Sequence, residues 1–186
     1  MVQTEIAAPP VVAVPRYASL FIEGLREANV SLVTFLPESL LKGVYRQLPH
    51  EEGIRVVRVS NEAEMPGIIA GAYLGGKRGL MMMENSGLRQ ACEPIARFMY
   101  THHMPLVMAM AFRGDFGEPN WWGHAHGETM EPILNALRIR THFVSTLDDI
   151  KPSIKKAFVH ADAGQSAVAL VFRGECVEAA APHVQD

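Results

Sequence analysis

Short apolar segments alternate with longer amphipathic stretches along most of this chain. The apolar segments are rich in valine, leucine and methionine, and several are apolar at consecutive positions. Such runs predict strands buried on both faces, whereas apolar residues spaced three and four apart predict helices. We predict strands at 30–36, 54–59, 79–84, 105–112, 140–144 and 167–172. Helices are predicted at 38–48, 62–74, 88–100, 130–137 and 148–160.

The connections between these strands decide how the strands are arranged. Helical stretches of about ten residues or more between strands indicate right-handed crossovers, which produce a parallel sheet. We therefore predict an α/β fold with three layers, a mostly parallel six-stranded sheet with helices on both faces. The predicted domain covers residues 19–178, between an N-terminal arm at 1–18 and a C-terminal tail at 179–186.

The methionines of two predicted strands allow two interpretations. Met81, Met82 and Met83 lie in one strand, and Met108 and Met110 lie in another. Their strand spacing favours the buried core, and a methionine-rich groove for a partner is the alternative.

Composition and charge narrow the functional classes. The chain has 186 residues, the size of one domain, and its net charge of -3 offers no basic face for nucleic acid or an anionic membrane. Cys92 and Cys176 form no CxxC pair, which argues against a zinc ribbon, a redox dithiol or a disulfide scaffold. The apolar runs are too short to span a bilayer, and prolines interrupt the apolar N-terminus. We expect a cytoplasmic protein without a signal peptide.

Ligands of parallel sheets bind at the carboxyl ends of the strands, so the residues after each strand are the first candidates. After the strand at 54–59, Ser60 and Asn61 are followed by Glu62 and Glu64. These residues suit the start of a helix, where a carboxylate favours the positive end of the dipole. The alternative is a carboxyl group that exchanges a proton with a ligand pressed against that helix. Small residues follow on it, namely Gly67, Ala70, Gly71 and Ala72.

The strand at 79–84 is followed by Asn85, Ser86 and Gly87. A glycine at the turn into a helix leaves backbone N–H groups free for a ligand, although the same residues also suit an ordinary strand-to-helix turn. Neither GxGxxG nor GxxxxGK(S/T) occurs, so neither phosphate-binding fingerprint is present.

The stretch at 112–129 is predicted to be a long glycine-rich loop, and loops of this length in a compact domain are usually functional. Arg113 is a candidate for binding an anionic substrate, and His124 and His126 are candidates for proton transfer in catalysis. Trp121 and Trp122 are candidates for contact with substrate or, equally, with another subunit. The two histidines have no third ligand nearby, and we predict no metal site in this chain.

In their order along the chain, these motifs resemble a known family. The residues that carry the resemblance are Asn61-Glu62 with Gly71, Asn85-Ser86-Gly87-Leu88, Arg113-Gly114-Asp115 and Gly117-Glu118. From about residue 19 to residue 172, the sequence resembles the pyrimidine-binding domain of thiamine diphosphate enzymes. Within these enzymes it is most similar to the sulfopyruvate and phosphonopyruvate decarboxylases. Where that family reads GLGN, this chain has Gly87-Leu88-Arg89-Gln90.

The resemblance implies a specific role for Glu62. In the family, the corresponding glutamate hydrogen-bonds N1′ of the cofactor's aminopyrimidine and so promotes removal of the thiazolium C2 proton. Asn85, Ser86, Gly87 and Leu88 fall on the cofactor-binding positions. The implied reaction is decarboxylation of a small 2-oxo acid. The acid is either sulfopyruvate, giving sulfoacetaldehyde and CO2 as in coenzyme M biosynthesis, or an analogue such as phosphonopyruvate.

The resemblance also implies that the diphosphate-binding half of the active site lies on another chain. Thiamine enzymes bind the diphosphate through Mg²⁺ with a GDG motif and a later asparagine on a second domain, and Gly114-Asp115-Phe116 is not that motif. We therefore expect a separate beta subunit that holds thiamine diphosphate and Mg²⁺, in a hetero-oligomer. Two alternatives stay open: another thiamine-dependent carboligase or lyase half-site, and a non-catalytic binding module on the same fold.

Overall fold

The computed structural model describes residues 14–178. Its strands are β1 (Leu32–Phe35), β2 (Arg55–Arg58), β3 (Gly79–Glu84), β4 (Leu106–Ala111), β5 (Arg140–Val144) and β6 (Ala167–Phe172). Its helices are α1 (Arg16–Glu27), α2 (Lys42–Gln47), α3 (Glu64–Leu74), α4 (Leu88–Ile95), α5 (Trp121–Ala136), α6 (Leu147–Gly164) and α7 (Gly174–Glu178), with the shorter η1 (Leu48–His50), η2 (Asn85–Gly87) and η3 (Ala96–Thr101). Within residues 14–178, no helix combines the length and the apolar character needed to cross a membrane.

The strands form one parallel six-stranded sheet with the order β2-β1-β3-β4-β6-β5. β1, β4 and β6 are buried along their whole length, whereas the edge strands β2 and β5 are partly exposed. The predicted three-layer α/β fold is confirmed. The consecutive apolar residues mark the inner strands because those strands are covered on both faces.

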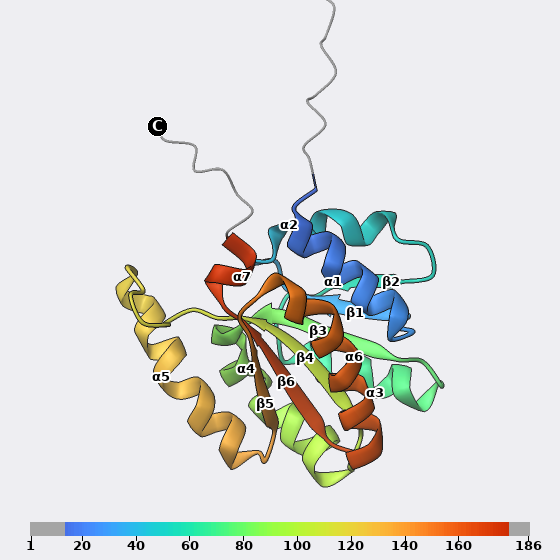
Figure 1. Ribbon diagram of the computed structural model, residues 1–186. Coiled ribbons are helices and arrows are strands. Elements are labelled where there is room, and N and C mark those ends of the chain that lie inside the picture. The colour runs from blue at the N-terminus through green and yellow to red at the C-terminus, as the bar shows by residue number, and fades with distance from the viewer. Residues whose placement is uncertain (1–13, 179–186) are drawn as a thin grey trace, which may run out of the picture.

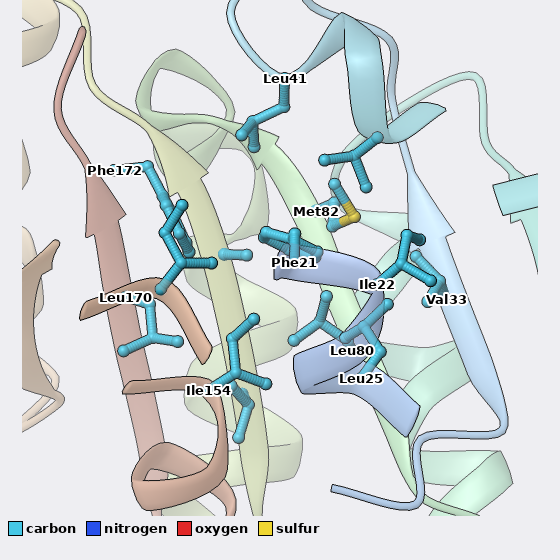
Figure 2. Packing of buried hydrophobic residues seen from close by; sticks show 14 of the residues in the cluster. Phe21, Ile22, Leu25, Val33, Leu41, Leu80, Met82, Ile154, Leu170 and Phe172 are labelled. Carbon is cyan, nitrogen blue, oxygen red and sulfur yellow. The ribbon is translucent and has the colours of Figure 1, made fainter. Parts of the chain in front are cut away.

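Helices α1, α2 and α6 cover one face of the sheet (Figure 1). Phe21 and Leu25 of α1 and Ile154 of α6 pack towards Leu80 and Phe172 of the sheet (Figure 2). The rings of Phe21 and Phe172 have their centres 5.3 Å apart. Full burial of a side chain of this size stabilises the fold by about 1.5–3 kcal/mol, so this layer anchors the sheet firmly.

The opposite face is covered by α3, α4 and α5, and its core is rich in methionine. Met81 and Met83 of β3 and Met108 and Met110 of β4 are fully buried there, while Met82 is buried on the first face. The core interpretation of these methionines is therefore confirmed. Their unbranched side chains fill the space between sheet and helices.

Helix α1 was not predicted from the sequence. It begins at Arg16, and it packs along α6. A Cβ atom at Gly24 would lie only 2.9 Å from Cδ1 of Ile154, so the glycine that weakens the helical pattern is what allows the two helices to approach closely. Residues 1–13 of the predicted arm at 1–18 lie outside the described residues. The whole predicted tail at 179–186 lies outside them as well.

The long loop predicted at 112–129 is wrong in its second half, because α5 already begins at Trp121. Gly123 and Gly127, which suggested a loop, lie on the α5 surface that the chain crosses at Gly114. A Cβ atom at Gly114 would lie 2.6 Å from the backbone nitrogen of Gly127 and would overlap the carbonyl oxygen of Gly123. Gly127 is required by the close backbone of Gly114, and Gly123 by the side chain of Glu118.

The topology has a switch point at the carboxyl ends of β1 and β3. The chain leaves β1 towards α2 on one face and leaves β3 towards α4 on the other, although the two strands are neighbours. In open parallel sheets, ligands bind where the connections separate in this way. The loops after β1, β2, β3 and β4 are therefore the elements that can build a site.

Candidate active site

Glu62 and Gly87 are brought together at the carboxyl edge of the sheet. Glu62 lies in the turn before α3 and is partly exposed, and Gly87 is buried in the turn before α4. A Cβ atom at Gly87 would lie 2.5 Å from Oε1 and 2.6 Å from Cδ of Glu62. The carboxyl group therefore rests on the backbone of Gly87, and a side chain at that position would displace it.

The alternative role of Glu62 was to support the start of the helix, and its neighbours make the hydrogen bonds there. The Asn61 side-chain oxygen accepts a hydrogen bond from the backbone N–H of Ala63 at 2.8 Å, and Glu64 accepts one from the Ser60 hydroxyl at 2.7 Å. Glu64 is exposed, whereas the Glu62 carboxylate has no hydrogen-bond partner within residues 14–178. Of the two glutamates, Glu62 is the one left available to a ligand.

Asn85 joins two of the loops at this edge. Its side chain is buried; its Nδ2 donates to the backbone oxygen of Arg113 at 2.8 Å, and its Oδ1 accepts from the Arg113 N–H at 3.0 Å. Both ends of the amide are therefore used to hold the loop after β4. Leu88 lies in the core, and Ser86 is partly exposed. Toward a ligand, Leu88 can offer only its backbone, whereas Ser86 can also offer its hydroxyl.

Arg113 lies within a network of acidic groups rather than facing an open site. Its guanidinium is 3.6 Å from Glu84 and 3.9 Å from Glu118, and its Nη2 donates to the Ser39 hydroxyl at 2.7 Å. It also lies 5.7 Å from the ring centre of Trp122. The charge of Arg113 is thus balanced inside the chain, and the arginine ties the loop after β4 to β3.

Glu118 organises the same loop. Its carboxylate accepts hydrogen bonds from the N–H of Gly114 at 3.2 Å and from the backbone and side chain of Asn120 at 3.1 and 2.8 Å. Burial raises the pKa of Glu118, but these hydrogen bonds and the charge of Arg113 outweigh burial and lower the pKa below its usual value. Glu118 is therefore ionised at neutral pH.

Glu38 lies after β1, at the start of the predicted helix at 38–48, and was not among the predicted site residues. Its carboxylate accepts hydrogen bonds from the N–H groups of Leu40 and Leu41 at 2.6 and 2.5 Å and from the Tyr45 hydroxyl at 3.1 Å. Burial raises the pKa of Glu38, and Glu84 contributes to the increase. The signal that points to Glu38 is the one applied to Glu62, a carboxyl group shortly after a predicted strand.

The two histidines differ in their surroundings. His124 is exposed on α5, whereas His126 accepts a hydrogen bond at Nδ1 from Nη2 of Arg89 at 2.7 Å. Because arginine can only donate, this contact requires a neutral His126 with its proton on Nε2. The His126 ring lies 5.7 Å from that of Trp122, while Trp121 is 85% exposed. Within residues 14–178, no three His, Cys, Asp or Glu side chains are arranged to hold a metal ion.

We predict that His126 titrates below its usual pKa of 6.5, because burial and the charge of Arg89 outweigh Glu84 and Glu118. Because the unfolded chain then binds the proton more readily, the free energy of unfolding falls as the pH drops through 6.5. Arg89→Gln should raise the pKa of His126, measured by NMR titration of its ring and assigned with His126→Gln. An unchanged pKa would show that the contact does not form in solution.

Comparisons with known proteins show which sequences and which fold this chain is similar to. No protein-family model matches the chain. The sulfopyruvate decarboxylase subunit alpha of Methanocaldococcus jannaschii is 28% identical over 148 residues, which cover 80% of this chain and 88% of that protein. The corresponding subunit of Methanothermobacter thermautotrophicus is 30% identical over 95 residues, 51% of this chain and 58% of its own. The chain is therefore a relative of the sulfopyruvate decarboxylase alpha subunits.

Two further similarities extend this relationship. The phosphonopyruvate decarboxylase of Streptomyces viridochromogenes is 30% identical over 101 residues, 54% of this chain but only 25% of that larger protein. A solved structure of a 2-oxoglutarate:ferredoxin oxidoreductase from Magnetococcus marinus matches 95% of this chain with a TM-score of 0.63, at 15% identity and over 32% of its own length. The first confirms the predicted resemblance, and the second shows the same fold.

Proposed function

We propose that this chain is the alpha-type subunit of a thiamine diphosphate-dependent decarboxylase of 2-oxo acids, sulfopyruvate or a close analogue such as phosphonopyruvate. The observation that carries the proposal is the Glu62 carboxylate, which rests on Gly87 at the carboxyl edge of the sheet without a partner in the described chain. The names of the relatives support the reaction class, since all of them are decarboxylases.

The residues at this edge fit an aminopyrimidine ring. Thiamine diphosphate, when bound, supplies the electron sink that allows a 2-oxo acid to lose CO2. Glu62 is placed to share a proton with a ring nitrogen such as N1′, because its carboxylate is partly exposed and fixed against a glycine. The backbone of 85–87 borders the same space, and Ser86 and Gly87 are proposed to contact the ring there. Trp121 and Trp122 are proposed to border the substrate.

A second subunit completes the proposed enzyme. The sequence contains no GDG motif, and relatives of similar length carry the name of an alpha subunit. We propose that the diphosphate and Mg²⁺ are held by a separate beta subunit. The active site then forms only where this subunit meets the carboxyl edge of the sheet.

Reconstitution tests this proposal. Alone, the chain should release no CO2 from sulfopyruvate or phosphonopyruvate, even with thiamine diphosphate and Mg²⁺, because the proposed binding site for the diphosphate lies on the beta subunit. Co-expression with a neighbouring reading frame that encodes GDG and a downstream asparagine should give turnover, measured as CO2 release. Turnover by the chain alone would contradict the split site.

The alternatives give different products. A carboligase would join the substrate fragment to an added acceptor aldehyde, whereas a decarboxylase releases sulfoacetaldehyde or phosphonoacetaldehyde whether or not the acceptor is present. A binding module would release neither product when reconstituted with the partner. Product analysis by NMR with and without an acceptor therefore separates the three functions.

A further inference from the structure

We propose that Arg89 binds the acidic group at the far end of the substrate, the sulfonate or phosphonate that distinguishes these 2-oxo acids from pyruvate. This inference rests on the proposed function and is particular to this chain, because Arg89 stands where the family's GLGN motif has its second glycine. It is independent of Glu62, which acts on the cofactor.

Arg113 and Arg89 both lie at this edge, but within the described chain only one of them is paired with carboxylates. Arg113 has Glu84 and Glu118 as ion-pair partners, so an anion would have to compete with two carboxylates. None of the ion pairs formed within residues 14–178 involves Arg89, which is exposed. Arg89 therefore keeps a full positive charge available to an anion.

The contacts of Arg89 fix its guanidinium without neutralising it. Its Nη1 donates to the Thr129 hydroxyl at 3.0 Å and to the Ala125 carbonyl oxygen at 3.3 Å, and its Nη2 lies 2.7 Å from Nδ1 of His126. All three acceptors are uncharged. These contacts use at most three of the five N–H donors and leave the Nε–H among those that remain. A planar fork of free N–H groups matches two oxygens of a sulfonate or phosphonate.

The position of Arg89 suits this role. It lies in the first turn of α4, two residues after the glycine on which Glu62 rests. On its other side it contacts α5, where His126 and Trp122 stack with ring centres 5.7 Å apart. Arg89 is the one cation of α4, and its guanidinium lies on the side of that helix that faces α5. Arg97, farther along the chain, is paired with Glu93.

The test uses the reconstituted complex and two substrates, sulfopyruvate and pyruvate. Arg89→Gln should raise KM for sulfopyruvate by about 10- to 100-fold, as expected for losing hydrogen bonds to a charged group, and leave KM for pyruvate within about 2-fold. Arg89→Lys should lie between, because it keeps the charge and loses the fork. Arg97→Gln is the matched control and should behave as wild type, since Arg97 is an exposed arginine engaged with Glu93.

An NMR titration of the full chain with sulfoacetate gives a readout without turnover. The ring signals of His126 should shift in the wild type and not in Arg89→Gln, and acetate should have a much weaker effect. Equal KM increases for both substrates, or a sulfoacetate shift that survives in Arg89→Gln, would overturn the inference. Failure of the wild-type complex to turn over any 2-oxo acid would instead contradict the proposed function, and the titration would still decide whether Arg89 binds the anion.

Discussion

Glu62→Gln should lower kcat of the reconstituted decarboxylase by about 100- to 10,000-fold, the range that a positioned acid–base group typically contributes. Glutamine keeps the size of the side chain and its place against Gly87 but cannot exchange a proton with a ring nitrogen. Because the Glu62 carboxylate has no hydrogen-bond partner in the described chain, the thermal unfolding temperature should stay near that of the wild type.

Glu64→Gln is the matched control for this substitution. Glu64 is exposed and bonded to Ser60, so its replacement should change kcat by less than about 2-fold, a surface effect. Comparing the two variants separates the loss of a proton-exchanging group at position 62 from the loss of one negative charge in this turn. A Glu62→Gln complex that kept more than half of the wild-type rate would remove the basis of the proposed function.

Gly114→Ala should destabilise the chain by about 3 kcal/mol, the largest stability effect that we expect from a single methyl group. Gly114 has φ of 86°, where an alanine costs about 1–2 kcal/mol. The added Cβ would also collide with the backbone of Gly123 and Gly127 on α5, and such overpacking costs about 1–3 kcal/mol. In a chain of this size the unfolding temperature should fall by roughly 6–12 °C, measured by calorimetry or circular dichroism.

Gly117→Ala isolates the backbone part of this effect. Gly117 has a similar φ of 89°, but a Cβ atom there would meet no other atom within 4 Å. Its loss of stability should therefore be only the conformational cost of about 1–2 kcal/mol. If the two variants lost equal stability, the close crossing of the β4 loop over α5 would not form in solution.

Elements whose pattern is set by neighbouring residues in the sequence were predicted well, and elements that depend on distant contacts were not. Strands β3, β5 and β6 begin and end where predicted, because a change from apolar to polar residues marks where a strand leaves the core. α1 and the first turns of α5 were missed because Gly24, Gly123 and Gly127 weaken the local helical pattern. Gly24 is required by Ile154, Gly123 by Glu118 and Gly127 by Gly114, contacts that the helical pattern does not contain.

The candidate site also has a part that the sequence predicts and a part that only the structure shows. The sequence predicted Glu62 and the turn at 85–87 as candidates, because polar residues that follow an apolar strand segment are visible in the chain itself. It could not reveal that Asn85 is used by the backbone of Arg113, or that Arg113 is paired with acidic groups while Arg89 is not. Asn85 and Glu84 belong to β3 and the turn after it whereas Arg113 follows β4, so their proximity depends on the sheet order.

By itself, the sequence determined the parallel sheet, the methionine core and the family resemblance, because strand composition and motif order are properties of the chain alone. Only the tertiary structure decided which charged groups neutralise one another at the carboxyl edge of the sheet. Electrostatic interactions depend on distances in space, and those distances are set by how the loops after β1, β3 and β4 pack against α4 and α5.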